Sequence, residues 1–207
     1  MGQHVIKTYW HENEFQQNTY IIELEDKCIL VDAGCPPNII DDFIKKPIVA
    51  IFITHAHFDH IKYIEDYDRL NIPIYAHKNA LQILSDERLD ASNMFDQPTR
   101  FYIENIQTID EGEIKNFGVE INAYYTPGHS SDSMSYLIEN DLYSGDTLFS
   151  EAIGRYDLAT SDKNDLIASL KKLQNLKFNK LYGDHGRSSN INEQQRDIDY
   201  WMKTVQK

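Results

Sequence analysis

The chain has 207 residues, of which 41% are hydrophobic and 26% are charged, which is ordinary for a soluble globular protein. Its formal net charge of −13 argues against nucleic acid as a partner, because phosphate groups are bound by basic patches. Only two cysteines are present, and no run approaches the roughly 20 apolar residues of a membrane span. We therefore expect a cytoplasmic protein with no membrane partner, and nothing in the sequence indicates its oligomeric state.

The first quarter of the chain is predicted to form strands with one helix between them. Short apolar segments predict strands over residues 5–9, 19–24 and 28–31, the last two joined by an acidic turn. The pair Pro36-Pro37 opens a predicted helix that ends near Ile44. The run 48–53 shows no polar alternation, which predicts a strand covered on both faces.

The remainder of the chain mixes short strands with helices. Predicted strands cover residues 73–76, 106–109, 119–125, 133–138, 141–143 and 181–182. Predicted helices cover residues 61–67, 78–84, 165–176 and 192–205, and Asp162 is the expected N-cap of the third. Residues 86–105 show no clear period, so no element is predicted there. Many strands with interspersed helices predict an α/β fold whose helices cover the sheet faces.

One stretch concentrates polar groups directly after the predicted buried strand. His55, His57, Asp59 and His60 fall within six residues. Three imidazoles and a carboxylate are costly to desolvate unless they are paired or bound to a metal. A divalent cation is the simplest compensation, so this stretch predicts a metal site.

Three further candidate ligands also follow apolar strands, in loops that contain glycine. They are His129, Asp146 and His185. Because loops at strand ends are where an α/β scaffold gathers convergent groups, we expect all seven side chains to meet. One zinc ion takes about four ligands, so seven fit two ions that share a carboxylate at a separation of about 3.5–4 Å. A histidine and carboxylate set without thiolate suits zinc, iron or manganese.

Several motifs resemble a known family. Residues 54–60 are similar to the His-x-His-x-Asp-His signature of the metallo-β-lactamase superfamily. The later candidates His129, Asp146 and His185 stand in that superfamily's order. The segments that resemble the glyoxalase II (hydroxyacylglutathione hydrolase) branch are 17–20, 31–34, 126–130, 144–149 and 154–158. The resemblance covers about residues 5–190, nearly the whole chain.

The resemblance implies an architecture. It implies a four-layer αββα sandwich with the site at one edge, formed by a single metallo-β-lactamase-like domain over residues 1–207 that ends in a short helix. A full-length glyoxalase II carries a C-terminal helical domain that holds glutathione. Only about 20 residues follow His185 here, so that domain is expected to be lacking and glutathione recognition is not implied.

The resemblance also assigns a role to each candidate residue. The first metal would bind His55, His57 and His129. The second metal would bind Asp59, His60 and His185. Asp146 would bridge the two ions, zinc being the expected metal, together with a hydroxide that attacks a thioester carbonyl. Asp59 and Asp146 are the candidate catalytic residues, and Asp32 and Asp184 would orient ligand imidazoles from behind.

Two other activities share these motifs. In an iron-dependent persulfide dioxygenase, one iron would use only His55, His129 and Asp146, a two-histidine-one-carboxylate site open to dioxygen. Another metal-dependent hydrolase of the same fold, such as a lactonase, is the second alternative. A thioester hydrolase predicts two metals per chain and release of a thiol. The dioxygenase predicts one iron and uptake of oxygen.

One departure from the family pattern stands beside the expected metals. The superfamily usually has Gly-Gly after the last histidine of the signature, whereas this chain has Ile61-Lys62-Tyr63. We expect this segment to alter the start of the adjacent helix and to narrow the site. The other histidines, His4, His11 and His77, lie outside the motifs and are expected to have no part in metal binding.

Overall fold

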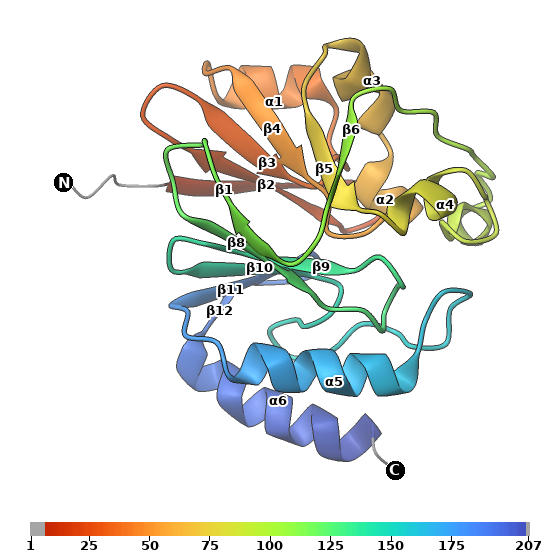
Figure 1. The fold of residues 1–207 in the computed structure, drawn as a ribbon, viewed down its shortest axis with the longest axis vertical. Coiled ribbons are helices and arrows are strands. Elements are labelled where there is room, and N and C mark those ends of the chain that lie inside the picture. Colours follow the sequence, from red (N-terminus) through yellow and green to blue (C-terminus); the bar gives the residue numbers. More distant parts are fainter. Residues whose placement is uncertain (1–6, 206–207) are drawn as a thin grey trace.

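The computed structural model describes residues 7–205, which form two six-stranded sheets that lie face to face (Figure 1). The first sheet has the order β1-β2-β3-β4-β5-β6, and the second has the order β12-β11-β10-β9-β8-β7. The strands of the first sheet are β1 (Lys7–Glu12), β2 (Asn18–Glu23), β3 (Cys28–Val31), β4 (Ile48–Phe52), β5 (Ile74–His77) and β6 (Ile106–Ile109). Those of the second are β7 (Gly112–Ile114), β8 (Ile121–Tyr125), β9 (Met134–Ile138), β10 (Asp141–Gly145), β11 (Lys180–Gly183) and β12 (Ser189–Asn190).

Helices cover the outer face of each sheet. Beside the first sheet lie α1 (Pro37–Phe43), α2 (Phe58–Ile61), α3 (Ile64–Arg69) and α4 (Ala80–Leu84). Beside the second lie α5 (Lys163–Gln174) and α6 (Ile191–Val205), as Figure 1 shows. Within residues 7–205, none of these helices has the length and apolar character needed to cross a membrane.

Three hydrophobic clusters separate the four layers. Ile51 belongs to the cluster between the first sheet and its helices, whereas Phe52 belongs to the cluster between the two sheets. Leu170 of α5 belongs to the third cluster, on the outer face of the second sheet. Neighbouring residues of β4 therefore bury opposite faces, as its unbroken apolar run predicts. The predicted α/β fold with the αββα arrangement is confirmed.

The loops that follow strands of both sheets meet at one edge of the sandwich. The Met134 amide at the start of β9 donates to the Thr54 carbonyl beyond β4, at 2.7 Å. The Asn18 amide at the start of β2 donates to the Asp184 carbonyl beyond β11, at 2.8 Å. These bonds join the two sheets through backbone atoms. They bring the segments after β4 and β11, which carry predicted site residues, to the same place.

The predicted helix over residues 61–67 is interrupted. The Tyr63 amide donates to the Ala33 carbonyl on the loop after β3, at 3.0 Å, instead of continuing the first helix. As a result α2 ends at Ile61 and α3 begins at Ile64. The buried Ile61 packs into the cluster beneath the helices, so the atypical Ile61-Lys62-Tyr63 segment redirects the chain here.

Other elements differ from the prediction mainly in extent. β8 begins at Ile121 rather than residue 119, and β7 and β12 were not predicted because two or three residues carry no readable period. The first two residues of the predicted strand 5–9 lie outside the described residues. The segment 86–105 contains only the short 3-10 helix η1 (Ser92–Phe95).

A first prediction concerns the hydrogen bond between the sheets at this edge. The hydroxyl of Tyr136, on β9, is buried and donates to the Ile53 carbonyl at 2.7 Å. Tyr136→Phe leaves that buried carbonyl without its donor, which should lower the free energy of unfolding by about 1–3 kcal/mol. Denaturant titration measures this loss. Tyr102→Phe, at a side chain that is 73% exposed, is the control and should change stability little. Equal losses in both variants would contradict the prediction.

Candidate metal centre

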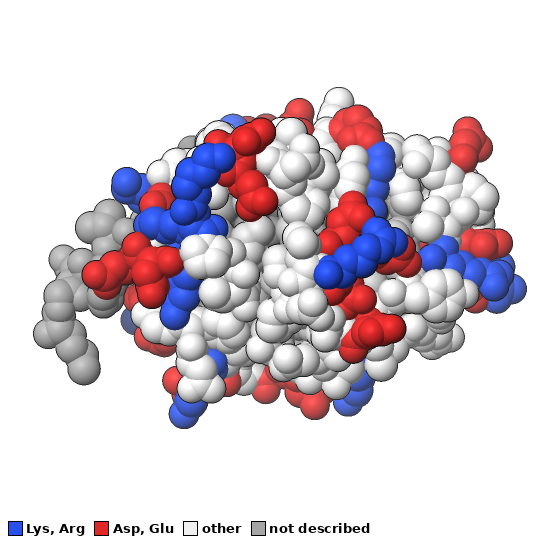
Figure 2. All heavy atoms as spheres, turned by 90° about the horizontal axis from the view of Figure 1, so that it is seen from above, with Lys and Arg blue, Asp and Glu red and all other residues white. Residues whose placement is uncertain are grey.

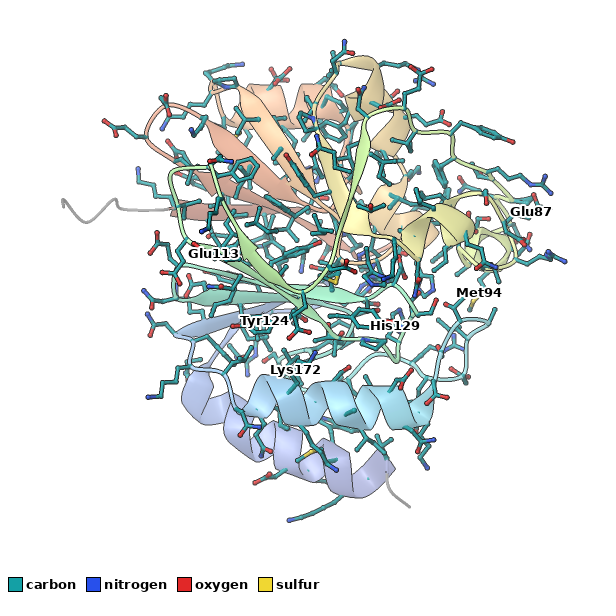
Figure 3. All side chains as sticks on the ribbon, viewed as in Figure 1. Glu87, Met94, Glu113, Tyr124, His129 and Lys172 are labelled. Carbon is teal, nitrogen blue, oxygen red and sulfur yellow. The ribbon has the colours of Figure 1, made fainter. Side chains whose placement is uncertain are left out.

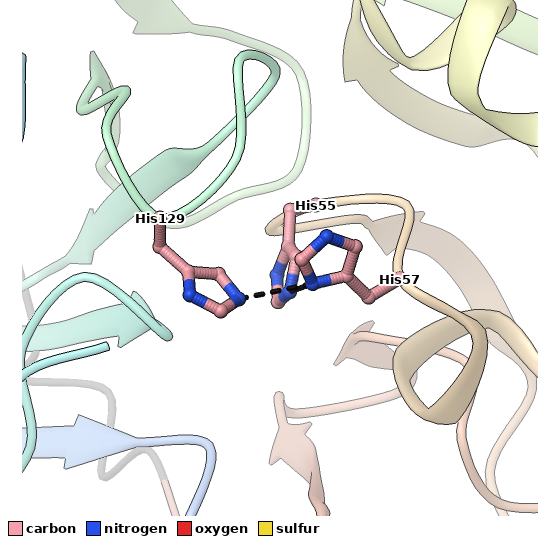
Figure 4. Close-up of side chains that lie close together, drawn as sticks. All are labelled: His55, His57 and His129. Carbon is pink, nitrogen blue, oxygen red and sulfur yellow. Dashed lines mark hydrogen bonds between the residues drawn. The ribbon is translucent and has the colours of Figure 1, made fainter. Parts of the chain in front are cut away.

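Three imidazole nitrogens from two loops meet in a buried position (Figure 4). His55 and His57 lie on the loop after β4, and His129 lies on the loop after β8. The Nδ1 atom of His57 is 3.0 Å from the Nε2 atom of His55 and 3.0 Å from the Nε2 atom of His129. Nitrogens bound tetrahedrally to one zinc ion would lie about 3.3 Å apart. These three residues, here called the first set, therefore have a spacing close to that of ligands around one cation.

A second set lies next to the first and consists of Asp59, His60 and His185. Asp59 and His60 belong to the short helix α2, and His185 follows β11. The Oδ2 atom of Asp59 is 3.7 Å from His60 Nε2 and 3.5 Å from His185 Nε2. The His60 side chain is fully buried, whereas that of His185 is 31% exposed. Solvent therefore reaches the centre from the side of His185.

Asp146, at the end of β10, faces both sets. Its Oδ2 atom is 3.5 Å from Nε2 of His129 in the first set and 3.5 Å from Nε2 of His185 in the second. Its Oδ1 atom is 3.5 Å from His60 Nε2. A side chain at Gly154 would overlap the Asp146 carbonyl and come within 2.9 Å of His129 Nδ1, so glycine permits the loop to pass this close.

All seven predicted ligands thus lie at one edge of the sandwich. Figure 3 shows that His129 lies toward the side of the molecule that carries Met94 and Glu87, opposite to Glu113. The prediction that loops at strand ends bring these side chains together agrees with the geometry, because each loop leaves its sheet at this edge. His77 lies elsewhere, stacked on Tyr125 with 4.2 Å between ring centroids. His4 lies outside the described residues.

Three of the five imidazoles are oriented by a bond from their outer nitrogen to a carbonyl or carboxylate oxygen, and the outer Nδ1 of a fourth, His55, lies 3.2 Å from the Thr54 hydroxyl. The Nδ1 partners are the Arg155 carbonyl for His129 (2.9 Å), the Gln16 carbonyl for His185 (2.8 Å) and the Asp32 carboxylate for His60 (2.8 Å). When neutral, a ring that donates through Nδ1 carries its lone pair on Nε2. In each case that Nε2 atom is the one turned toward the other ligands, as metal binding requires.

Both acidic residues predicted to orient imidazoles lie behind His60. Asp32 adopts a left-handed backbone (φ 65°), and its carboxylate accepts from the Thr54 amide at 2.7 Å as well as from His60. Asp184 Oδ2 lies 3.4 Å from His60 Nδ1. Burial raises the pKa of Asp184, and the neighbouring Asp32 raises it further.

The imidazoles of the first set are neutral at pH 7. Burial lowers the pKa of His57 to about 3, and the nearby His129 contributes to that shift. Burial also lowers the pKa of His55 and of His129. Neutral imidazole is the form that binds a cation. The first set is thus ready for metal without losing a proton.

The second set and Asp146 carry charge in the metal-free protein. Burial acts to lower the pKa of His185, but Asp146 and Asp59 outweigh it and raise that pKa to about 10. Burial likewise opposes the protonation of His60, whose pKa is raised by Asp59, Asp146 and Asp32. Burial would raise the pKa of Asp146, but His60 and His185 hold it below its usual range. These protons occupy the place that a cation would take.

The residues present fit two metal ions. His60 Nε2 and Asp146 Oδ1 are buried and lie 3.5 Å apart, and neither makes a hydrogen bond within residues 7–205. A cation between them would satisfy both atoms. Cys28 and Cys35 pack in the core beneath the helices, so no thiolate belongs to the donor set. Together with the fold, the clusters indicate a dinuclear metal site whose donors suit zinc, iron or manganese.

A further carboxylate lies beside the centre, and no motif of the sequence points to it. Asp132 is 1% exposed, and its Oδ2 atom accepts from the Ala56 amide at 2.8 Å. Burial raises the pKa of Asp132 to about 6, while hydrogen bonds from Ser130 and Ala56 hold it down. A polar residue in the Ser130–Ser133 segment was the available signal. It is a weak one, because such residues are ordinary in loops.

Comparison with known proteins relates the chain to one family. The model of the metallo-beta-lactamase superfamily matches residues 13–185. The probable metallo-hydrolase YqgX of Bacillus subtilis is 33% identical over 190 residues, covering 85% of this chain and 88% of that protein. The hydroxyacylglutathione hydrolase of Francisella philomiragia is 29% identical over 181 residues, covering 83% of this chain and 63% of that protein.

Solved structures show the same architecture. BLEG-1, a B3 metallo-beta-lactamase, superposes with a TM-score of 0.85 at 28% identity, covering 95% of this chain and 99% of that chain. TTHA1623, solved in a di-iron-bound form, superposes with a TM-score of 0.79 at 26% identity, covering 92% of this chain and 98% of that chain. A similar fold in a neighbouring protein therefore holds two metal ions.

A second prediction follows from the protonation of the second set. The pKa of His185 is raised to about 10, so this ring is protonated at pH 7.5, and the pKa of His60 is also raised well above its ordinary value by the surrounding carboxylates. A cation that binds the second set must therefore displace protons from these rings. Zinc binding to the metal-free protein should release about two protons per chain. Calorimetry in buffers of different ionisation enthalpy measures this number.

Two variants serve as controls. His185→Ala should release about one proton fewer, whereas His57→Ala should release the same number, because His57 is already neutral. A release unaffected by the loss of His185 would contradict the assignment.

Proposed function

The chain belongs to the metallo-beta-lactamase superfamily and is a metallo-hydrolase, and on that premise we propose that its two-metal site hydrolyses a thioester. The similarity to a hydroxyacylglutathione hydrolase supports a thioester substrate. The substrate is a small molecule. Figure 2 shows a face on which basic and acidic side chains are interspersed, which offers no broad basic surface to a polyanion.

We assign the first metal to His55, His57 and His129 and the second to Asp59, His60 and His185. The observation that carries this assignment is the position of the Asp146 carboxylate. One of its oxygens is equally close, at 3.5 Å, to a nitrogen of each set, which supports a bridging role. Zinc is the metal we propose, because these donors suit it and because hydrolysis needs no redox change.

The chemistry divides between the metals and the chain. Two divalent cations bound here would lower the pKa of a shared water and polarise the substrate carbonyl. Asp59 lies on the more open side beside His185, where its carboxylate can accept a hydrogen bond from the attacking water and orient it. The departing thiolate is stable near neutral pH, so no general acid has to protonate it. The lack of need for a general acid agrees with the centre, in which the groups other than Asp59 are all assigned to metal binding.

A cavity next to the segment that follows His185 offers room for the body of a substrate. It has a volume of about 360 Å³ and is lined by Trp10, Tyr20, Tyr182 and the segment 186–188. Ligand pockets have volumes of about 300–1,000 Å³ and predominantly apolar and aromatic walls. Gly186, in its wall, directly follows His185. We place the thiol portion of the substrate here.

A third prediction tests the bridging residue. Asp146→Ala removes the carboxylate that faces both sets, so metal binding should weaken at least about tenfold and thioester hydrolysis should fall to background. Metal content after dialysis and the rate of thiol release are the measurements. His77→Ala is the matched control, since this buried histidine stacks on Tyr125 away from both sets, and it should keep both metals and the full rate. Two metals and an unchanged rate in Asp146→Ala would overturn the assignment.

A fourth prediction separates the proposed hydrolase from the dioxygenase. Protein isolated from its native host should contain two metal ions per chain and should release a thiol from a hydroxyacyl thioester. A dioxygenase would instead contain one iron per chain and would take up oxygen in the presence of a persulfide. Metal analysis, a thiol assay and an oxygen electrode on the same preparation decide the question. One iron with oxygen uptake and no thiol release would overturn the proposal.

A further inference from the structure

Asp132 bridges the two loops that carry the first set. It lies on the loop between β8 and β9, and its side chain is buried. Its Oδ2 atom accepts from the Ala56 amide at 2.8 Å, and its Oδ1 atom accepts from the Ser130 hydroxyl at 2.5 Å. Ala56 stands between His55 and His57, and Ser130 directly follows His129. One carboxylate is thus bonded to a residue adjacent to each member of the first set.

The neighbouring backbone bonds hold the ends of the histidine loop but not its middle. The Met134 amide holds the Thr54 carbonyl at 2.7 Å, before the first histidine. The Phe58 amide donates to the Asp90 carbonyl at 2.7 Å, after the second histidine. The bond from Ala56 to Asp132 lies midway between these two anchors. It is therefore placed to fix how far the tip of this loop stands from the loop of His129.

We propose that Asp132 is a positioning residue that sets the separation of the three nitrogens of the first set. The inference rests on the proposed function, since it takes His55, His57 and His129 as the ligands of one metal. His57 Nδ1 lies 3.0 Å from His129 Nε2 across the two loops. Without the shared carboxylate the two loops can separate, and the first set loses its preorganised spacing.

The charge of Asp132, like its geometry, favours metal binding at the first set. Its oxygens are paired with an amide and a hydroxyl rather than with a lysine or arginine. A buried anion without a cation partner is costly. A metal held by the adjacent histidines supplies the missing positive charge, so bound metal and buried carboxylate stabilise each other. The effect of losing Asp132 should therefore be larger on the first metal than on the second.

The test measures metal binding to each set in the full chain. Zinc alone is titrated into protein with ¹⁵N-labelled histidines, and assigned ring resonances report the first set and the second set separately. A competing chelator gives the two dissociation constants. In Asp132→Ala the dissociation constant of the first set should rise about 10–100-fold, while that of the second should stay within about threefold. Asp132→Asn keeps an oxygen for the Ala56 amide and should restore most of the affinity.

Two further variants keep the result interpretable. Asp68→Ala removes a different buried carboxylate, which accepts from the Asn105 amide at 2.8 Å, and should lower stability without changing either dissociation constant. Ser130→Ala removes the second bond of Asp132, together with the contact of the same hydroxyl with the Thr160 hydroxyl at 3.0 Å, but keeps the bond from Ala56. It serves if Asp132→Ala does not fold. It should weaken the first set severalfold, and an unchanged first set in this variant would overturn the inference.

The outcomes distinguish this inference from the function on which it rests. Wild-type protein that binds no zinc would overturn the proposed function and the inference with it. Wild-type protein that binds two zinc ions, with unchanged affinities in Asp132→Ala, would overturn the inference alone. An equal loss from both sets in Asp132→Ala would also overturn it, because a general loss of structure has no preference between them.

Discussion

The carboxylate of Asp146 lies 3.5 Å from nitrogens of three different histidines, and the rest of the structure depends on that convergence. Buried charges at such short distances interact strongly, so the negative charges of the carboxylates must be balanced by nearby positive charges if the domain is to remain folded. In the metal-free protein, protons on His60 and His185 provide the balance. With metal bound, cations would provide it. Both states need donors from two sheets to meet at one edge, and the αββα sandwich satisfies this requirement.

Several buried residues behind the ligands have a strained backbone or a buried carboxylate, which the packing of the fold alone does not explain. Asp32 has a left-handed backbone, which costs about 1 kcal/mol or more for a residue other than glycine. Its carboxylate in return receives the Thr54 amide, the Thr54 hydroxyl and the outer nitrogen of His60. Asp132 plays a comparable part at the first set. One buried carboxylate thus fixes the ring of His60 directly, whereas the other joins the two loops that carry the first set.

The features that could be predicted from the sequence are those with a local cause. The apolar run of β4 shows burial on both faces, and Asp162 caps α5 through bonds from the Asn164 and Asp165 amides at 2.7 and 3.0 Å. The convergence of the seven candidate ligands could be expected from the sequence, because imidazoles and carboxylates gathered after buried strands are costly to bury unless a metal binds them. Residues 86–105 were not predictable, because contacts distant in sequence fix them, such as the Phe58 amide bound to the Asp90 carbonyl. Asp132 was missed for the same reason, since its partner Ala56 is 76 residues away.

The segment after the signature shows how a departure from a family pattern can serve the same centre. Ile61 is buried beneath the helices, and Lys62 forms an ion pair with Glu14 and lies over the Phe15 ring. Those two partners belong to the loop between β1 and β2. That loop contacts the second set twice, since Gln16 accepts from His185 and Asn13 donates to the Asp59 carbonyl at 3.0 Å. Lys62 therefore anchors a loop that holds two members of the second set. The bulky Lys62 side chain need not obstruct the centre, because it is long enough to place its ammonium group against the loop between β1 and β2.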